Sequence, residues 1–155
     1  MLAVIIMGSP GDRPFAGEIT QGLEKFGIPC QLYVSSAHKT PRELLQLLDR
    51  CEADPQPKVY ITVAGRSNAL SGFVDAQVSA PVIACPPYSD RFSGTDLFSS
   101  LRMPSGVAPA VVLEPSAAAL LAAKILGVSD APLRARVCRF QEEQRQRVLD
   151  ANEPH

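Results

Sequence analysis

The chain has one internal histidine, His38, in a short polar loop that runs from Ser35 to Pro41; the other, His155, is the last residue. The segment Gln31 to Val34 leads into this loop as an expected strand, and a leucine-rich helical pattern follows it. Ligands of open α/β sheets bind at such carboxyl ends of strands. Histidine side chains can exchange protons near neutral pH, so His38 is our candidate for acid–base chemistry. The alternative is a histidine that caps a turn or a helix.

Two further loops follow expected strands. Gly8 to Asp12 offers backbone N–H groups and one hydroxyl near a helix start, which suits a phosphate group. Its glycine and lysine spacing matches neither a Walker loop nor a dinucleotide fingerprint. Asp12 would repel phosphate and better suits a sugar hydroxyl, and the same loop could instead be a capping turn with Asp12 as the cap.

The loop from Ala64 to Asn68 contains a glycine and three polar side chains. Arg66 could bind a phosphate or carboxylate, or form a structural or intersubunit ion pair. Asn68 could contact a ligand or cap the next helix. Around His38, the hydroxyls of Ser35 and Ser36 and the cation of Lys39 suit a phosphorylated ligand, although Lys39 could also be a solvated surface lysine.

Other catalytic constellations have little support. The serines beside His38 are not in a G-x-S-x-G elbow. The cysteines are widely spaced, so they indicate packing residues in a reducing compartment and no zinc site. Their positions are Cys30, Cys51, Cys85 and Cys138.

Composition limits the class of protein. The chain has 155 residues, 46 % of them apolar, and a formal net charge of −1. This size and apolar content predict one ordinary domain over residues 1–155. The absence of a basic stripe argues against nucleic-acid binding. The apolar runs are too short to span a membrane, and we interpret Met1 to Met7 as a first strand and not as a signal peptide. We therefore expect a cytoplasmic protein.

Strand and helix patterns alternate along the chain. We expect strands at residues 2–7, 30–34, 58–63, 81–84 and 110–113, and helices at about 15–26, 41–51, 69–78, 95–101, 115–126 and 130–149. The second helix should bury one stripe, formed by Leu44, Leu45, Leu48 and Cys51. The alternation predicts a three-layer α/β/α sandwich with a central parallel sheet (flavodoxin/Rossmann-like), a core over about 2–128, and an extended C-terminal helix. In such a fold the three loops converge at one sheet edge.

The residues alone therefore indicate a small α/β enzyme or binding protein for a phosphorylated small molecule. Specific motifs narrow this prediction, because in order and together they resemble the aminoimidazole ribonucleotide (AIR) carboxylase family of purine biosynthesis. The motifs are Ile6-Met7-Gly8-Ser9, Ser36-Ala37-His38-Lys39-Thr40-Pro41, Ala64-Gly65-Arg66-Ser67-Asn68, Cys85-Pro86-Pro87 and Ser99-Ser100-Leu101-Arg102-Met103-Pro104-Ser105-Gly106.

The resemblance implies an ATP-independent carboxylase without metal or other cofactor, active as a homo-octamer with sites at subunit contacts. Its substrates would be the ribonucleotide and CO2, and His38 would transfer the proton. By position, the ribose phosphate would be held by Ser9, Asp12, Ser36 and Lys39. The base and CO2 would lie against Ala64, Gly65, Arg66, Ser67 and Leu70. Gly8, Gly11, Ala37 and Asn68 complete the implied substrate-binding set. The family's first loop usually reads Gly-Ser-x-Ser-Asp, so Gly11 lacks a hydroxyl.

Lys39 and the Ala64 to Asn68 loop resemble the class II branch, which uses CO2 directly. Members of the other branch usually have an arginine after the loop histidine and a Gly-Ala-Gly-Gly third loop. Three alternatives remain open at this point. They are mutase activity on the N-carboxylated isomer of the substrate, ribonucleotide binding without catalysis, and a flavodoxin-like cofactor or interaction module. The charged end, Gln141 to Leu149, is expected to pack as a helix on a neighbouring subunit, or else to be a frayed solvent-exposed end.

Overall fold

A computed structural model describes residues 1–152; residues 153–155, with His155, lie outside the described part. Its centre is a five-stranded parallel sheet in the order β2-β1-β3-β4-β5. The strands are β1 (Leu2–Met7), β2 (Cys30–Val34), β3 (Lys58–Val63), β4 (Val82–Ala84) and β5 (Ala110–Val111). The three strands that precede the candidate loops, β2, β1 and β3, are therefore neighbours in the sheet.

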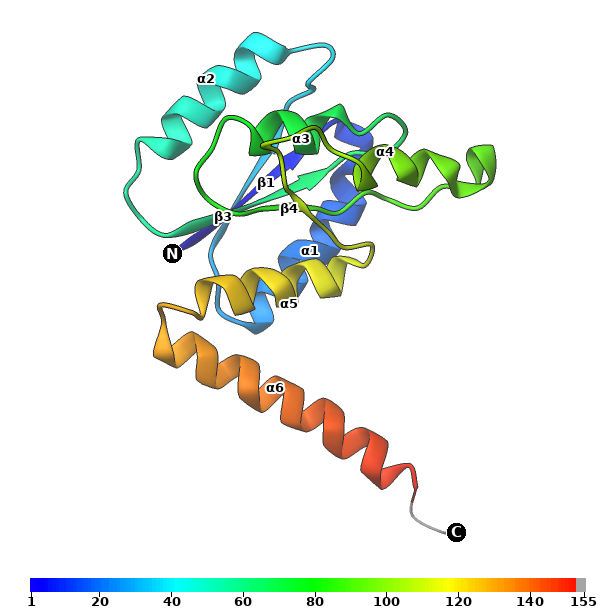
Figure 1. Ribbon diagram of the computed structural model, residues 1–155. Helices are drawn as coiled ribbons and strands as arrows, with labels where there is room; N and C mark the ends of the chain where they lie inside the picture. Colours follow the sequence, from blue (N-terminus) through cyan, green and yellow to red (C-terminus); the bar gives the residue numbers. More distant parts are fainter. Residues whose placement is uncertain (153–155) are drawn as a thin grey trace.

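Helices cover both faces of the sheet (Figure 1). The helices are α1 (Arg13–Lys25), α2 (Pro41–Glu52), α3 (Ala69–Asp75), α4 (Phe98–Leu101), α5 (Pro115–Leu126) and α6 (Ala131–Asp150), with short 3₁₀ segments η1 (Pro10–Asp12) and η2 (Arg91–Leu97). One face packs against α1 and α5, and the other against α2 and α3. This arrangement confirms the predicted three-layer sandwich around a parallel sheet.

The sequence explains where these elements begin. Every residue of β1 is buried, as expected for an apolar strand with a helical layer on each face. Proline at the first helical positions suits α1, α2, α5 and α6, because the amide N–H that proline lacks has no partner there. Asp130 caps α6, since its carboxylate accepts a hydrogen bond from the Leu133 N–H.

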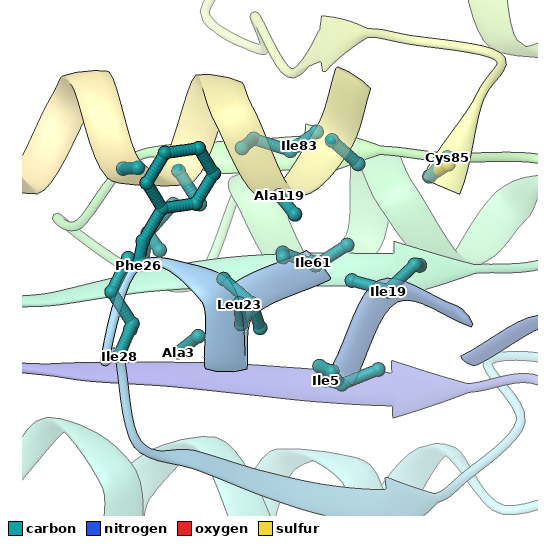
Figure 2. Packing of buried hydrophobic residues seen from close by; sticks show 14 of the residues in the cluster. Ala3, Ile5, Ile19, Leu23, Phe26, Ile28, Ile61, Ile83, Cys85 and Ala119 are labelled. Atoms are coloured by element: carbon teal, nitrogen blue, oxygen red, sulfur yellow. The ribbon is translucent and has the colours of Figure 1, made fainter. Parts of the chain in front are cut away.

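The larger core lies between the sheet and α1 and α5. Figure 2 shows Ile19, Leu23 and Phe26 of the α1 region above Ala3 and Ile5 of β1. The two helices approach closely because small residues face each other: a Cβ atom placed on Gly22 would lie 2.6 Å from the Cβ of Ala119. The alanine-rich sequence of α5 thus serves close helix packing within the subunit.

The structure corrects several details of the sequence prediction. In α2 the buried stripe is Leu44, Leu47, Leu48 and Cys51, whereas Leu45 is 39 % exposed. The prediction put Leu45 on the buried face, but Leu45 follows Leu44 by one position and its side chain therefore points away from the sheet. The α3 helix ends at Asp75, earlier than predicted, and β5 is only two residues long. Ahead of the helix expected at 95–101, the chain already turns from Arg91 on, with left-handed backbone at Phe92, Ser93 and Gly94.

Two parts of the fold leave apolar surface exposed. The edge strand β2 has Leu32 and Val34 exposed to 38 % and 39 %. The η2–α4 segment projects from the body (Figure 1) and exposes Phe92 and Phe98. The C-terminal helix α6 packs through its first half only, where Phe140 contacts Phe26 edge to face with ring centroids 5.3 Å apart.

Candidate functional site

The three candidate loops start side by side. Met7, at the end of β1, pairs with Val34 of β2 and Val63 of β3. The Gly8 N–H donates to the Val63 carbonyl and the Ser35 N–H donates to the Met7 carbonyl, each with an N···O distance of 2.9 Å. The structure thus brings the three loops to one edge of the sheet, as the sequence predicted. Gly8 permits this approach, because a Cβ atom there would lie 3.3 Å from the Cβ of Ala64.

Loop one (residues 8–12) forms a tight turn into α1. The Ser9 hydroxyl accepts a hydrogen bond from the Gly11 N–H at 3.2 Å and caps η1. Asp12 occupies the N-cap position of α1, but its side chain makes no capping hydrogen bond. Partial burial raises the pKa of the Asp12 carboxyl above its ordinary value, against a smaller opposing effect of the Ser9 backbone. Ser9 therefore caps η1, and the side-chain cap by Asp12 that the sequence offered as the alternative to ligand binding is not formed.

Loop two (residues 35–40) is closed by hydroxyl groups. The Thr40 hydroxyl accepts a hydrogen bond from the Ser36 N–H at 2.8 Å and lies 3.2 Å from the Ser35 hydroxyl. The Ser36 hydroxyl accepts from the Lys39 N–H at 3.3 Å. These contacts hold the turn at residues 37–39 and leave the His38 and Lys39 side chains exposed at its tip. His38 is thus displayed toward solvent on a fixed turn, while Ser35 is a buried structural residue.

Loop three (residues 64–68) has an unusual backbone. Arg66 has a φ of +57°, a left-handed conformation that a residue with a Cβ atom seldom adopts. Ala64, Gly65 and Arg66 line a shallow hollow, partly open to solvent, opposite Pro86 and Pro87. Gly65 packs against Pro87, since a Cβ atom on Gly65 would lie 3.7 Å from the Pro87 carbonyl oxygen, an ordinary van der Waals distance. His38 and Ser9 are outside the lining of this hollow.

Besides Ala64, which lines the hollow, two of the implied ligand-binding residues have buried side chains. The Asn68 Oδ1 accepts from the Ser71 N–H and hydroxyl, so Asn68 caps α3. Its Nδ2 donates to the Ser100 hydroxyl. Leu70 is buried in the cluster between the sheet and α2 and α3. In this structure both side chains make contacts within the fold next to loop three, and a ligand contact by either residue stays a prediction.

The structure also identifies supporting residues that residue-by-residue reasoning missed. The Ser99 hydroxyl lies 2.9 Å from the Arg66 carbonyl oxygen and accepts from the Asn68 N–H at 3.0 Å. The serine pair at 99–100 was part of the motif that carried the family resemblance, but nothing in its spacing assigned it a contact with loop three. The contacts join residues more than 30 positions apart.

The described residues offer neither a reactive thiol at Cys85 nor a cluster of metal ligands. Burial, with a smaller effect of the Glu114 charge, raises the pKa of the Cys85 thiol to about 12, so it is a poor nucleophile near neutral pH. Within residues 1–152, no three His, Cys, Asp or Glu side chains gather as metal ligands would. The same residues contain no helix with the length and apolar content that crossing a membrane requires.

The geometry defines an α/β protein with a histidine, a lysine and serine hydroxyls on loops that meet at one sheet edge. Comparison with known proteins agrees with this class. The family model AIR carboxylase matches residues 2–147. Phosphoribosylaminoimidazole carboxylase of Archaeoglobus fulgidus is 52 % identical over 99 % of this chain and 84 % of its own length. The crystal structure of Treponema denticola PurE superposes with a TM-score of 0.95 at 49 % identity, covering 96 % of this chain and 94 % of that one.

A mouse protein shares the same region within a longer chain. The bifunctional phosphoribosylaminoimidazole carboxylase/phosphoribosylaminoimidazole succinocarboxamide synthetase of Mus musculus is 41 % identical over 86 % of this chain but only 32 % of its own length. The chain described here belongs to the AIR carboxylase family. It is accordingly an enzyme of the carboxylase class, in the family that serves purine biosynthesis.

Proposed function

We propose that this protein is a class II AIR carboxylase, which joins CO2 directly and reversibly to carbon four of 5-aminoimidazole ribonucleotide to give 4-carboxy-5-aminoimidazole ribonucleotide. The observation that carries the proposal is the exposed His38–Lys39 turn beside loops one and three at one sheet edge. The relatives named as phosphoribosylaminoimidazole carboxylases, from Archaeoglobus fulgidus and Treponema denticola, support the same chemistry.

In the proposed reaction the ring carbon of the aminoimidazole attacks the carbon of CO2. One C–C bond forms, and an electron pair of a C=O bond moves to oxygen, which gives a carboxylate. The ring carbon then bears both hydrogen and carboxylate, and the ring is no longer aromatic. His38 accepts this proton, directly or through the new carboxylate, and the C–H electron pair restores aromaticity. General acid–base assistance of this kind is typically worth about 10²–10⁴-fold.

The other implied residues position the ribonucleotide. Ser9 and Asp12 of loop one, with Ser36 and Lys39 of loop two, hold the phosphate and ribose. Loop three, with Arg66 and the hollow beside it, receives the base and CO2. Holding reactants in place can supply several kcal/mol of a barrier reduction, so binding and water exclusion carry much of the proposed catalysis. The mechanism uses no metal or other cofactor.

We also propose that the protein works as a homo-octamer in the cytoplasm, with its sites at subunit contacts. The exposure of His38, Lys39 and Arg66 supports this, because a CO2-binding site must exclude water and one chain leaves these residues open. The exposed apolar side chains of β2 and of the η2–α4 segment offer surfaces for such contacts. The four cysteines, all within the described residues, are unpaired, in keeping with a reducing compartment. Light scattering of the purified protein should give eight subunits; a monomer would contradict the assembly.

The function is tested by following decarboxylation of 4-carboxy-5-aminoimidazole ribonucleotide by absorbance. We expect turnover without ATP or added metal, and its absence would contradict the proposal. Mutase activity is distinguished from direct carboxylation by measuring product formation from the N-carboxylated isomer in CO2-depleted buffer. A mutase converts the isomer at once, whereas a direct carboxylase forms product only as fast as the isomer releases CO2.

A further inference from the structure

A chain of buried polar side chains connects loop three with the sheet and with α4. The Thr62 hydroxyl of β3 lies 2.8 Å from the Ser71 hydroxyl, which donates to Asn68 Oδ1 at 2.9 Å. Asn68 Nδ2 donates to the Ser100 hydroxyl at 2.9 Å. All four residues are buried. Because an unpaired buried polar group costs about 1–3 kcal/mol, each member of the chain fixes its neighbours.

Ser99 extends this chain to the strained residue of loop three. Its hydroxyl oxygen is within hydrogen-bond distance of the Arg66 carbonyl and accepts from the Asn68 N–H. The hydroxyl thus bridges the two backbone groups that flank the turn at residues 66–68. The hydroxyl has a single proton, and the Asp96 carbonyl at 2.7 Å shares this proton with the Arg66 carbonyl at 2.9 Å.

The bridge explains how Arg66 keeps its left-handed backbone. Such a conformation in a non-glycine residue costs about 1–3 kcal/mol and persists only where the surroundings enforce it. With a right-handed or extended backbone, the Cα–Cβ bond of Arg66 would leave in another direction. The Arg66 side chain would then leave the loop at another angle to the hollow that Arg66 lines with Gly65 and Pro87.

We infer that Ser99 is a positioning residue for catalysis, which holds Arg66 in the orientation that binds the ribonucleotide, with Asn68 and Ser100 as its buried anchor. This inference rests on the proposed function, because the position of Arg66 matters only if Arg66 binds substrate. Ser99 itself is exposed and contacts the backbone of loop three at Arg66 and Asn68. It acts through Arg66 and not by touching the reacting atoms.

The inference is tested by a double-mutant cycle of Ser99→Ala and Arg66→Ala, with kcat and KM measured separately. Ser99→Ala should raise KM roughly tenfold, the effect of losing one charge-assisted contact, with kcat and the melting temperature little changed. In the Arg66→Ala background the same change should alter kcat/KM less than about twofold, since the two residues act as a unit. Ser99→Thr keeps the hydroxyl and should restore KM.

The two proposals fail in different ways. Equal effects of Ser99→Ala in both backgrounds, or no effect where Arg66→Ala is impaired, would overturn the positioning role alone. Wild-type kinetics of Arg66→Ala would overturn the assignment of Arg66 to the site and the inference with it. If Ser99→Ala does not fold, Ser99→Cys preserves the side-chain volume with a weak donor and acceptor, and the same cycle applies.

Discussion

Replacing Gly11 with serine should add the hydroxyl that loop one lacks. A Cβ atom on Gly11 would lie 3.5 Å from the Ser9 Oγ, an ordinary van der Waals distance, and Gly11 is not in the left-handed region. Serine therefore fits the existing turn. The residue is exposed, so solvent reduces the strength of a new hydrogen bond to a phosphate oxygen. We take about 1–1.5 kcal/mol, the upper part of the range for ordinary hydrogen bonds and just below the range for bonds to charged groups.

This energy corresponds to roughly five- to tenfold tighter binding. The assay is calorimetric titration with 5-aminoimidazole ribonucleotide, together with KM for the carboxylated product. Gly11→Ala is the matched control, because both variants stiffen the unfolded chain and both should raise stability by about 0.4–1 kcal/mol. Equal affinities of the serine and alanine variants would refute the idea that loop one faces the phosphate.

Three further predictions concern packing, pH and thiol reactivity. Gly22→Ala should lower the melting temperature by about 2–4 °C, because overpacking against Ala119 outweighs the gain in helix propensity. Gly17 lies in the same helix with open space around it, so Gly17→Ala should raise the melting temperature. Burial raises the pKa of Glu52, but hydrogen bonds from the Tyr60 hydroxyl (2.8 Å) and Ser79 outweigh it and keep the pKa below the ordinary value of 4.5. The resulting stability is present above the unfolded-state pKa and is lost as pH falls through the lower folded-state pKa. Tyr60→Phe should therefore cost about 1 kcal/mol at pH 7, and denaturant titrations of the variant should show a shallower loss of stability as the pH falls below 4.5, the ordinary pKa of Glu52. A thiol reagent at about pH 7.5 should label the exposed Cys138 well before the buried Cys85, and labelling of Cys85 in the native protein at the rate of unfolded chain would contradict its burial.

Much of the fold could be predicted because local patterns agree with the tertiary structure. Leu2 to Met7 is apolar throughout and is buried between two helical layers. Pro115 and the alanines after it give α5 the limits that the sequence predicts. The α2 stripe was less certain, because leucines at 44, 45, 47 and 48 fit two overlapping faces, and only the position of the sheet decides between Leu45 and Leu47.

The candidate site was predicted in part. Strand ends locate the three loops, but they do not give the sheet order that places β1 between β2 and β3. The left-handed turn at Phe92, Ser93 and Gly94 was missed because only its last residue is a glycine. The bridge from Ser99 to Arg66 was missed because it depends on how the η2–α4 segment returns to the sheet, which no local pattern specifies.

The central claim is that His38 transfers the ring proton, and the direct test is turnover of a His38→Asn variant beside its affinity for the ribonucleotide. We predict an affinity within about threefold of wild type and a kcat lower by roughly 10²–10⁴-fold, the usual contribution of general acid–base catalysis. Lys39→Ala, on the same exposed turn, is the control and should weaken binding more than turnover. Wild-type turnover by His38→Asn would contradict the mechanism.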